Sequence, residues 1–100
     1  MTKTEIIQTL TANKQKLHDE FGLKRIGLFG SYAKDLQTEE SDIDFLISFS
    51  QGKKKYRTFI ALSDFLELTF KRKIELVTTE SITNSFLNQI NPSLINVTIA

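Results

Sequence analysis

A short apolar run and two stretches of alternating residues predict three short β-strands in this chain. The first covers residues 23–29, where the apolar run 26–29 stops at Gly30. The second covers residues 42–49, in which Ile43, Phe45, Ile47 and Phe49 alternate with Asp42, Asp44, Leu46 and Ser48. The third covers residues 73–77, in which Ile74 and Leu76 alternate with Lys73, Glu75 and Val77. Because successive side chains of a strand point to opposite faces, Asp42 and Asp44 share one face of the second strand.

Helical periodicity predicts two longer helices, over residues 2–21 and 56–70. The first has apolar residues on one face, namely Ile6, Ile7, Leu10, Leu17 and Phe21. Thr2 and Glu5 have the spacing of a capping box at its start, and Gly22 suits a left-handed conformation just after its end. The second helix has the apolar stripe Phe59, Leu62, Phe65, Leu66 and Phe70. Both stripes are expected to pack in the core.

The remaining segments have weaker patterns. A short helix is expected at residues 31–34, and another is expected to begin near Ser81 and to end before Asn91-Pro92. The last apolar residues are Leu94, Ile95, Val97 and Ile99. Four of the last six residues are β-branched, which fits either a final edge strand or a tail that binds a partner, and the pattern does not decide between the two.

Composition narrows the class of protein. The 100 residues fit a single domain, 1–100, and 40% apolar with 25% charged residues is typical of a globular chain. A net charge of +1 gives no basic excess for nucleic-acid binding. Without cysteine, thiolate metal sites and disulfides are excluded. No apolar run approaches the length of a membrane span, so a cytoplasmic protein that does not contact the membrane is expected.

The candidate chemistry lies between the first two strands. Two carboxylates on one strand face, Asp42 and Asp44, repel each other unless a cation lies between them, and oxygen ligands suit Mg²⁺. Gly30 and Ser31 precede the short helix, where a glycine lets a phosphate approach free backbone N–H groups. Together these two features predict a site for phosphoryl or nucleotidyl transfer.

The spacing of these residues resembles a known signature. Gly30-Ser31, ten residues and then Asp42-x-Asp44 resemble the polymerase-β-like nucleotidyltransferase superfamily. The small size and the form GSYAKD…SDID resemble the minimal nucleotidyltransferase (MNT) antitoxins of bacterial HEPN–MNT toxin–antitoxin pairs. The resemblance covers roughly residues 23–77. It implies an α/β (α+β) fold, a small mixed sheet with flanking helices, most of them on one side.

The resemblance also implies roles for particular residues. Asp42, Asp44 and Glu75 would be catalytic and would hold two Mg²⁺ ions, while Gly30 and Ser31 would bind the nucleotide. The chain departs from the family at Lys34-Asp35, where Arg-Gly is usual, and at Glu75, where Asp is usual. Asp tolerates positive φ better than most residues, so the turn at Asp35 is expected to survive. Lys34 is expected to be an ordinary surface lysine.

The implied function is that of an antitoxin enzyme. ATP would be the donor, a tyrosine hydroxyl of a HEPN-type RNase toxin the acceptor, and the chain would assemble with that toxin. Two rival functions remain open. One is a non-catalytic antitoxin that masks its partner sterically, and the other is a nucleotidyltransferase that acts on a small molecule.

Two further features have simple interpretations. His18 lies beside Asp19 and Glu20 in the first helix and is expected to be solvated rather than a ligand. The basic run Lys53-Lys54-Lys55 is either a solvated loop or a patch that meets an acidic partner or the nucleotide.

Overall fold

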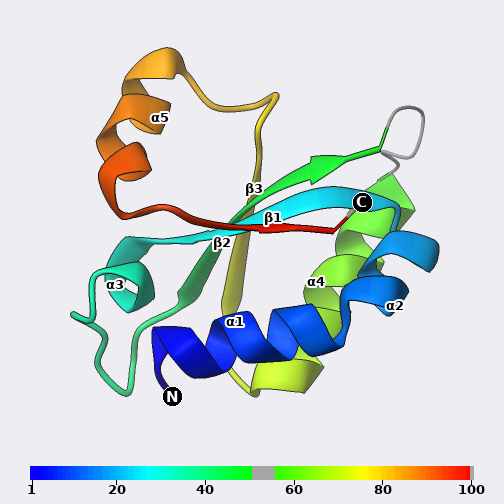
Figure 1. Ribbon diagram of the computed structural model, residues 1–100, viewed down its shortest axis with the longest axis horizontal. Helices are drawn as coiled ribbons and strands as arrows, with labels where there is room; N and C mark the ends of the chain where they lie inside the picture. The colour runs from blue at the N-terminus through cyan, green and yellow to red at the C-terminus, as the bar shows by residue number, and fades with distance from the viewer. Residues whose placement is uncertain (51–55, 100) are drawn as a thin grey trace.

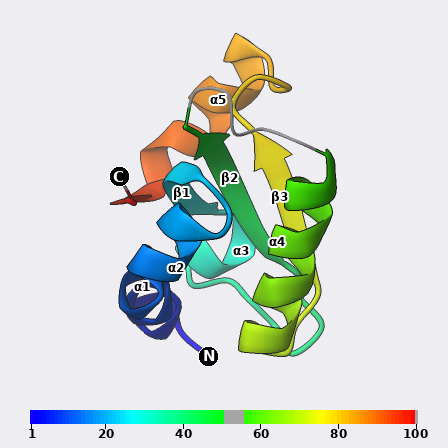
Figure 2. The same ribbon diagram turned by 90° about the vertical axis from the view of Figure 1, so that its right-hand side faces the viewer.

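A four-stranded mixed sheet forms the centre of the molecule. The computed structural model describes residues 1–50 and 56–99, which include β1 (Leu23–Phe29), β2 (Ile43–Phe49), β3 (Ile74–Thr78) and β4 (Ile95–Thr98). The strand order is β3-β2-β1-β4, and Figure 2 shows β2 between β1 and β3. β1 pairs antiparallel with both β2 and β4, whereas β2 and β3 are parallel. This topology confirms the predicted fold class.

Three helices cover one face of the sheet and enclose the core. They are α1 (Lys3–Ala12), α2 (Lys14–Asp19) and α4 (Tyr56–Phe70), which lie below the strands in Figure 1. The predicted inward set of β2 is fully buried at Ile43, Phe45 and Ile47. The core also includes Ile6, Leu10, Leu17, Ile26, Leu28, Leu62, Leu66 and Phe70. Both predicted helical stripes therefore pack in the core, and the bounds predicted for α4 are confirmed.

The prediction of one continuous helix over residues 2–21 is wrong. The structure has two helices that meet at Asn13, whose φ of −101° and ψ of 14° are not helical. The Asn13 side chain donates a hydrogen bond to the carbonyl of Thr9 (2.8 Å), and this local bond competes with continuation of the helix. The capping box of Thr2 and Glu5 is confirmed, and so is the left-handed Gly22, at φ +66°.

The opposite face of the sheet carries a smaller cover. α5 (Asn84–Ile90) and the 3₁₀ helix η1 (Asn91–Ser93) lie on this side, above the strands in Figure 1. α5 begins three residues later than the position near Ser81 that the sequence predicted, because the Thr83 hydroxyl accepts a hydrogen bond from the N–H of Phe86 and caps the helix there. Phe86 packs edge-on against Phe29 of β1, with ring centroids 5.8 Å apart.

The C-terminal segment forms an edge strand. β4 pairs with β1 from Ile95 to Thr98, and Ile99 is buried. Of the two alternatives that the sequence left open, the structure therefore confirms the edge strand. The basic run Lys53-Lys54-Lys55 lies outside the described residues. Among the described helices, none is both long and apolar enough to cross a membrane.

Candidate active site

The corner between β1 and α3 (Gly30–Ala33) forms one side of the site. Gly30 has φ +75°, a conformation that side chains other than glycine rarely adopt. A Cβ atom at Gly30 would overlap the carboxylate of Asp44 and would lie 3.0 Å from its Cγ. The backbone of Gly30 therefore lies directly against the Asp44 side chain, with the half-buried Ser31 next to it. The two halves of the predicted site, phosphate corner and metal carboxylates, meet in the fold.

Asp44 occupies the middle of this arrangement because of the strand register. It pairs with Phe29 of β1 on one side and with Glu75 of β3 on the other. The sequence predicted that Glu75 would reach the carboxylates if its strand neighboured theirs, and this placement is confirmed. Asp42 is half-buried and immediately precedes β2.

The carboxylates perturb one another. Burial raises the pKa of Asp44 to about 7, and a hydrogen bond with Glu75 and repulsion from Glu75 and Asp42 add to the rise. Without a cation, Asp44 thus keeps its proton to a higher pH than an ordinary carboxyl group does. A divalent cation would replace that proton and offset the repulsion, so the donor set fits Mg²⁺.

The structure brings the three predicted ligands together only in part. Asp44 and Glu75 are hydrogen-bonded, whereas Asp42 acts on Asp44 through its charge. In the described part of the chain, no three acidic, histidine or cysteine side chains form a ready-made metal-binding group. Glu75 is exposed, and among the ion pairs of the described residues none joins it to Lys73. The metal-ligand roles of Asp42, Asp44 and Glu75 stay predictions.

The residues that depart from the family pattern lie at the edge of the site. Lys34 is exposed at the end of α3, as expected for a surface lysine. Asp35 has φ +59°, so the turn is kept without the usual glycine, and its carboxylate forms an ion pair with Lys3 (3.1 Å). Sequence reasoning missed Phe86, which contacts Phe29 directly beside Asp44. No spacing relates Phe86 to the signature residues, because the contact depends on where α5 folds back.

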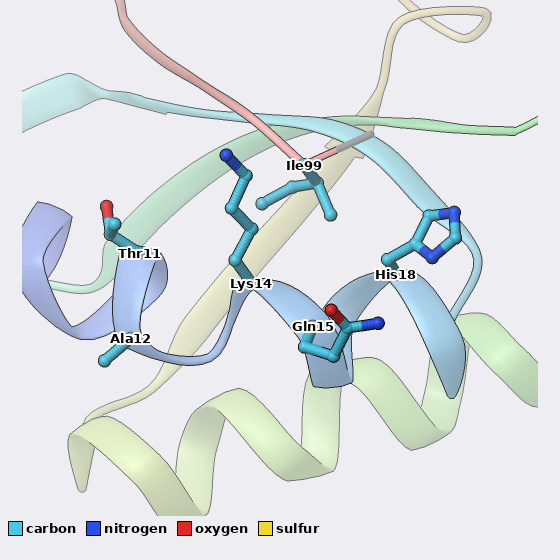
Figure 3. Close-up of a pocket in the computed structure, with 6 residues that line it drawn as sticks. All are labelled: Thr11, Ala12, Lys14, Gln15, His18 and Ile99. Carbon is cyan, nitrogen blue, oxygen red and sulfur yellow. The ribbon is translucent and has the colours of Figure 1, made fainter.

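A hollow lies away from the carboxylates. Its volume is about 510 Å³, and Figure 3 shows Lys14, Gln15 and His18 of α2 beneath Ile99, beside Thr11 and Ala12 of α1. His18 is exposed, and its ring is 2.9 Å from the carboxylate of Asp19. The hollow contains none of the signature residues, so we place the chemistry at the carboxylates around Asp44.

Replacing Gly30 by alanine should displace the carboxylate of Asp44 from its position in the site. The new Cβ would be strained at positive φ and would push the carboxylate away, at a cost of about 1–3 kcal/mol in the free energy of unfolding. Gly22→Ala is the matched control, since Gly22 has φ +66° but its added Cβ meets no close atom in the described residues. Urea unfolding should show a loss of stability in both variants, but only Gly30→Ala should also lose the nucleotidyl transfer that the sequence predicts. Equal transfer by the two variants would contradict the prediction.

The raised pKa of Asp44 should make the metal-free protein less stable as the pH rises from about 4 to about 7. The folded state keeps the proton up to a pKa of about 7, whereas the unfolded chain releases it near the ordinary value of 3.8. The folded state thus binds more protons in this range, so the free energy of unfolding falls with rising pH. Asp44 contributes a slope of at most about 1.4 kcal/mol per pH unit to the free energy of unfolding. The slope is smaller in practice, because Asp44 is partly exposed and solvent screens its interactions.

Urea unfolding of the parent and of Asp44→Asn, both in EDTA from pH 4 to pH 8, measures this contribution. The variant should have the flatter profile, and parallel profiles would contradict the assignment.

Comparison with known proteins identifies the family. A model of the nucleotidyltransferase domain matches residues 8–98, so the chain belongs to this family of enzymes. The protein adenylyltransferase MntA of Thermococcus cleftensis is 37% identical over 82 residues, which cover 82% of each chain. Within the family, this chain is therefore similar to enzymes that are named protein adenylyltransferases.

Solved structures share the fold. A minimal nucleotidyltransferase superposes with a TM-score of 0.72 at 25% identity, covering 89% of this chain and 93% of the other. A toxin–antitoxin complex with AMP-PNP gives a TM-score of 0.65 at 22% identity, covering all of this chain and 73% of the other. A tri-AMPylated HEPN toxin of Shewanella oneidensis in complex with MNT antitoxin gives a TM-score of 0.55 at 21% identity, covering 97% of this chain and 67% of the other. These similarities confirm the predicted mixed sheet with flanking helices.

Proposed function

We propose that the chain is the antitoxin of a toxin–antitoxin pair and transfers AMP from Mg²⁺-bound ATP to a hydroxyl group of a HEPN-type RNase toxin. The observation that supports this most directly is the contact of Gly30, Asp44 and Glu75 at one corner of the sheet. The relatives add support, since one structure holds the ATP analogue AMP-PNP and another holds an AMPylated HEPN toxin.

In the proposed reaction, the hydroxyl oxygen of the acceptor attacks the α-phosphorus of ATP. A bond forms between that oxygen and phosphorus, the bond to the bridging oxygen breaks, and pyrophosphate leaves while the hydroxyl gives up its proton. Bound Mg²⁺ would neutralise the phosphate charge and favour ionisation of the acceptor.

The residues of the chain would divide this work by position. Asp42 and Asp44 would hold the nucleotide-bound ion, and Glu75 would complete the second ion's site and orient the acceptor hydroxyl. Gly30 lets the β- and γ-phosphates approach the backbone closely, and the Ser31 hydroxyl can donate a hydrogen bond to them.

Intact-mass spectrometry of the toxin tests the proposal. Incubation of the cognate toxin with this protein, ATP and Mg²⁺ should add AMP units and abolish the RNase activity. Ser31→Ala and Asp42→Asn should lose the mass increments and the neutralisation together. Asp64→Asn, which changes an exposed carboxylate of α4, should keep both. If a variant with both Asp42 and Asp44 replaced by asparagine still silences the toxin, the protein masks its partner sterically and does not act by catalysis.

A further inference from the structure

A second cavity lies on the face of the sheet that carries the carboxylates. Its volume is about 220 Å³, and it lies between the sheet and the cover formed by α5 and η1. The cavity is lined by residues of the sheet and of the segments around it, namely Arg25, Leu46, Ser48, Thr79, Leu87, Asn91, Leu94 and Asn96. Along β2, residues 44, 46 and 48 share one face at a spacing of roughly 7 Å. The cavity therefore begins one pleat beyond Asp44.

The cavity depends on a second glycine. Gly27 of β1 is paired with Leu46 on one side and with Asn96 on the other. A Cβ atom at Gly27 would lie 2.8 Å from Oδ1 of Asn96 and 2.8 Å from Cδ1 of Leu94. The absence of a side chain at Gly27 thus allows Asn96 and Leu94 to lie low over the sheet, where they line the space.

The walls of the cavity combine apolar surfaces with free polar groups. Leu46, Leu87 and Leu94 supply apolar surface. In the described part of the chain, the side chains of Ser48, Asn91 and Asn96 form no hydrogen bond with the protein. A ligand that fits combines apolar surface with hydrogen-bond donors and acceptors, as adenine does. Asparagine can pair with the N6 and N7 edge of adenine through two hydrogen bonds.

The size of the cavity limits the ligand. Clefts that hold a whole drug-sized molecule have volumes of roughly 300–1,000 Å³, so about 220 Å³ suits a single base rather than a complete nucleotide. A base bound there would leave its ribose and phosphate directed along β2 toward Asp44, since one to two pleats separate the cavity from the carboxylate.

We propose that this cavity is an adenine subsite of the transfer site. The proposal rests on the proposed function and extends it. Either of two molecules can supply the adenine: the donor ATP, or an AMP unit already joined to the acceptor. In the second case, a ribose hydroxyl of the bound unit attacks the α-phosphorus of the next ATP, pyrophosphate leaves, and the AMP chain grows by one unit.

Adenosine is the probe for the subsite, because it lacks phosphate and needs neither metal nor toxin. In ¹H–¹⁵N spectra, titration with adenosine should shift the side-chain amide signals of Asn91 and Asn96 and the backbone signal of Gly27. Replacing Asn91 and Asn96 together by alanine should weaken binding about tenfold, since two hydrogen bonds are lost. Asn88→Ala is the matched control, because Asn88 is exposed on α5 and does not line the cavity. Ser48→Leu, which fills the cavity, should also abolish the shifts while the far-UV spectrum stays native.

The rates at which successive AMP mass increments appear on the toxin distinguish the two sources. If the cavity holds the donor base, the alanine double variant should slow the first AMP addition and weaken ATP binding to the free protein. If it holds the acceptor base, the first addition should proceed at the parental rate and the later ones should stop. Adenosine shifts outside the cavity, or unchanged adenosine affinity in the variants, would overturn the subsite. A protein that binds adenosine there but never modifies the toxin would refute the proposed function and leave the subsite intact.

Discussion

Glu75→Gln should slow AMP transfer by roughly two to three orders of magnitude and leave the affinity for MgATP nearly unchanged. Glu75 lies beside Asp44 in the parallel register of β2 and β3, and its side chain is exposed. The proposed phosphate corner at Gly30 lies against Asp44 and not against Glu75. The proposed role of Glu75 is therefore toward the acceptor hydroxyl and the second ion. An interaction that matters only as the bond forms changes the rate of transfer and not the binding of the donor.

Calorimetry with MgATP and the rate of toxin modification measure the two quantities separately. Glu75→Asp should retain activity, because it keeps a carboxylate and restores the residue usual in the family. Glu67→Gln removes an exposed glutamate from α4, on the other side of the sheet, and should have no effect on either quantity. A Glu75→Gln protein that transfers AMP at the parental rate would show that Glu75 is an ordinary surface residue.

Replacing both Asp42 and Asp44 by asparagine should abolish the Mg²⁺-dependent part of ATP binding and all detectable transfer. Two negative charges would be lost from the site. Among the described groups that act on Asp44, only Glu75 would still carry a carboxylate. The same double change should stabilise the metal-free protein at neutral pH, because burial and repulsion oppose ionisation of Asp44.

Titration of ATP with Mg²⁺ and again with EDTA measures the first effect, and urea unfolding in EDTA measures the second. Asp64→Asn controls for the loss of a surface carboxylate. If the double variant binds ATP equally in both buffers and as tightly as the parent does with Mg²⁺, the carboxylates do not hold the ion.

Much of this fold follows from local patterns. The alternation in residues 42–49 determined which side of β2 would be buried, and the structure buries Ile43, Phe45 and Ile47 accordingly. The break at Asn13 was not predictable from periodicity, since apolar residues continue on the same face of α2 at Leu17. A side-chain hydrogen bond, rather than a change in hydrophobic pattern, ends α1 there.

The site was predictable only in part, for a related reason. Gly30 and Asp44 belong to a fixed spacing, so their proximity could be inferred before the strands were placed. Phe86 and Asn96 come from segments far along the chain, and their positions depend on how α5 and β4 return to the sheet. Sequence patterns describe faces of elements, whereas neighbours across the sheet depend on the packing of the whole chain.

The parallel pairing of β2 with β3 has a consequence for how the protein acquires activity as it is made. The 15-residue helix α4 separates these strands along the chain, so Asp44 and Glu75 meet only after the connection has folded across the sheet. Such long-range pairings form late, because the entropy of closing the loop must be overcome first. A growing chain that ends before β3 already contains Gly30 and Asp44 but lacks Glu75. On the proposed roles, toxin neutralisation would therefore begin only when synthesis has passed β3, and it would lag behind the formation of the β1–β2 pair.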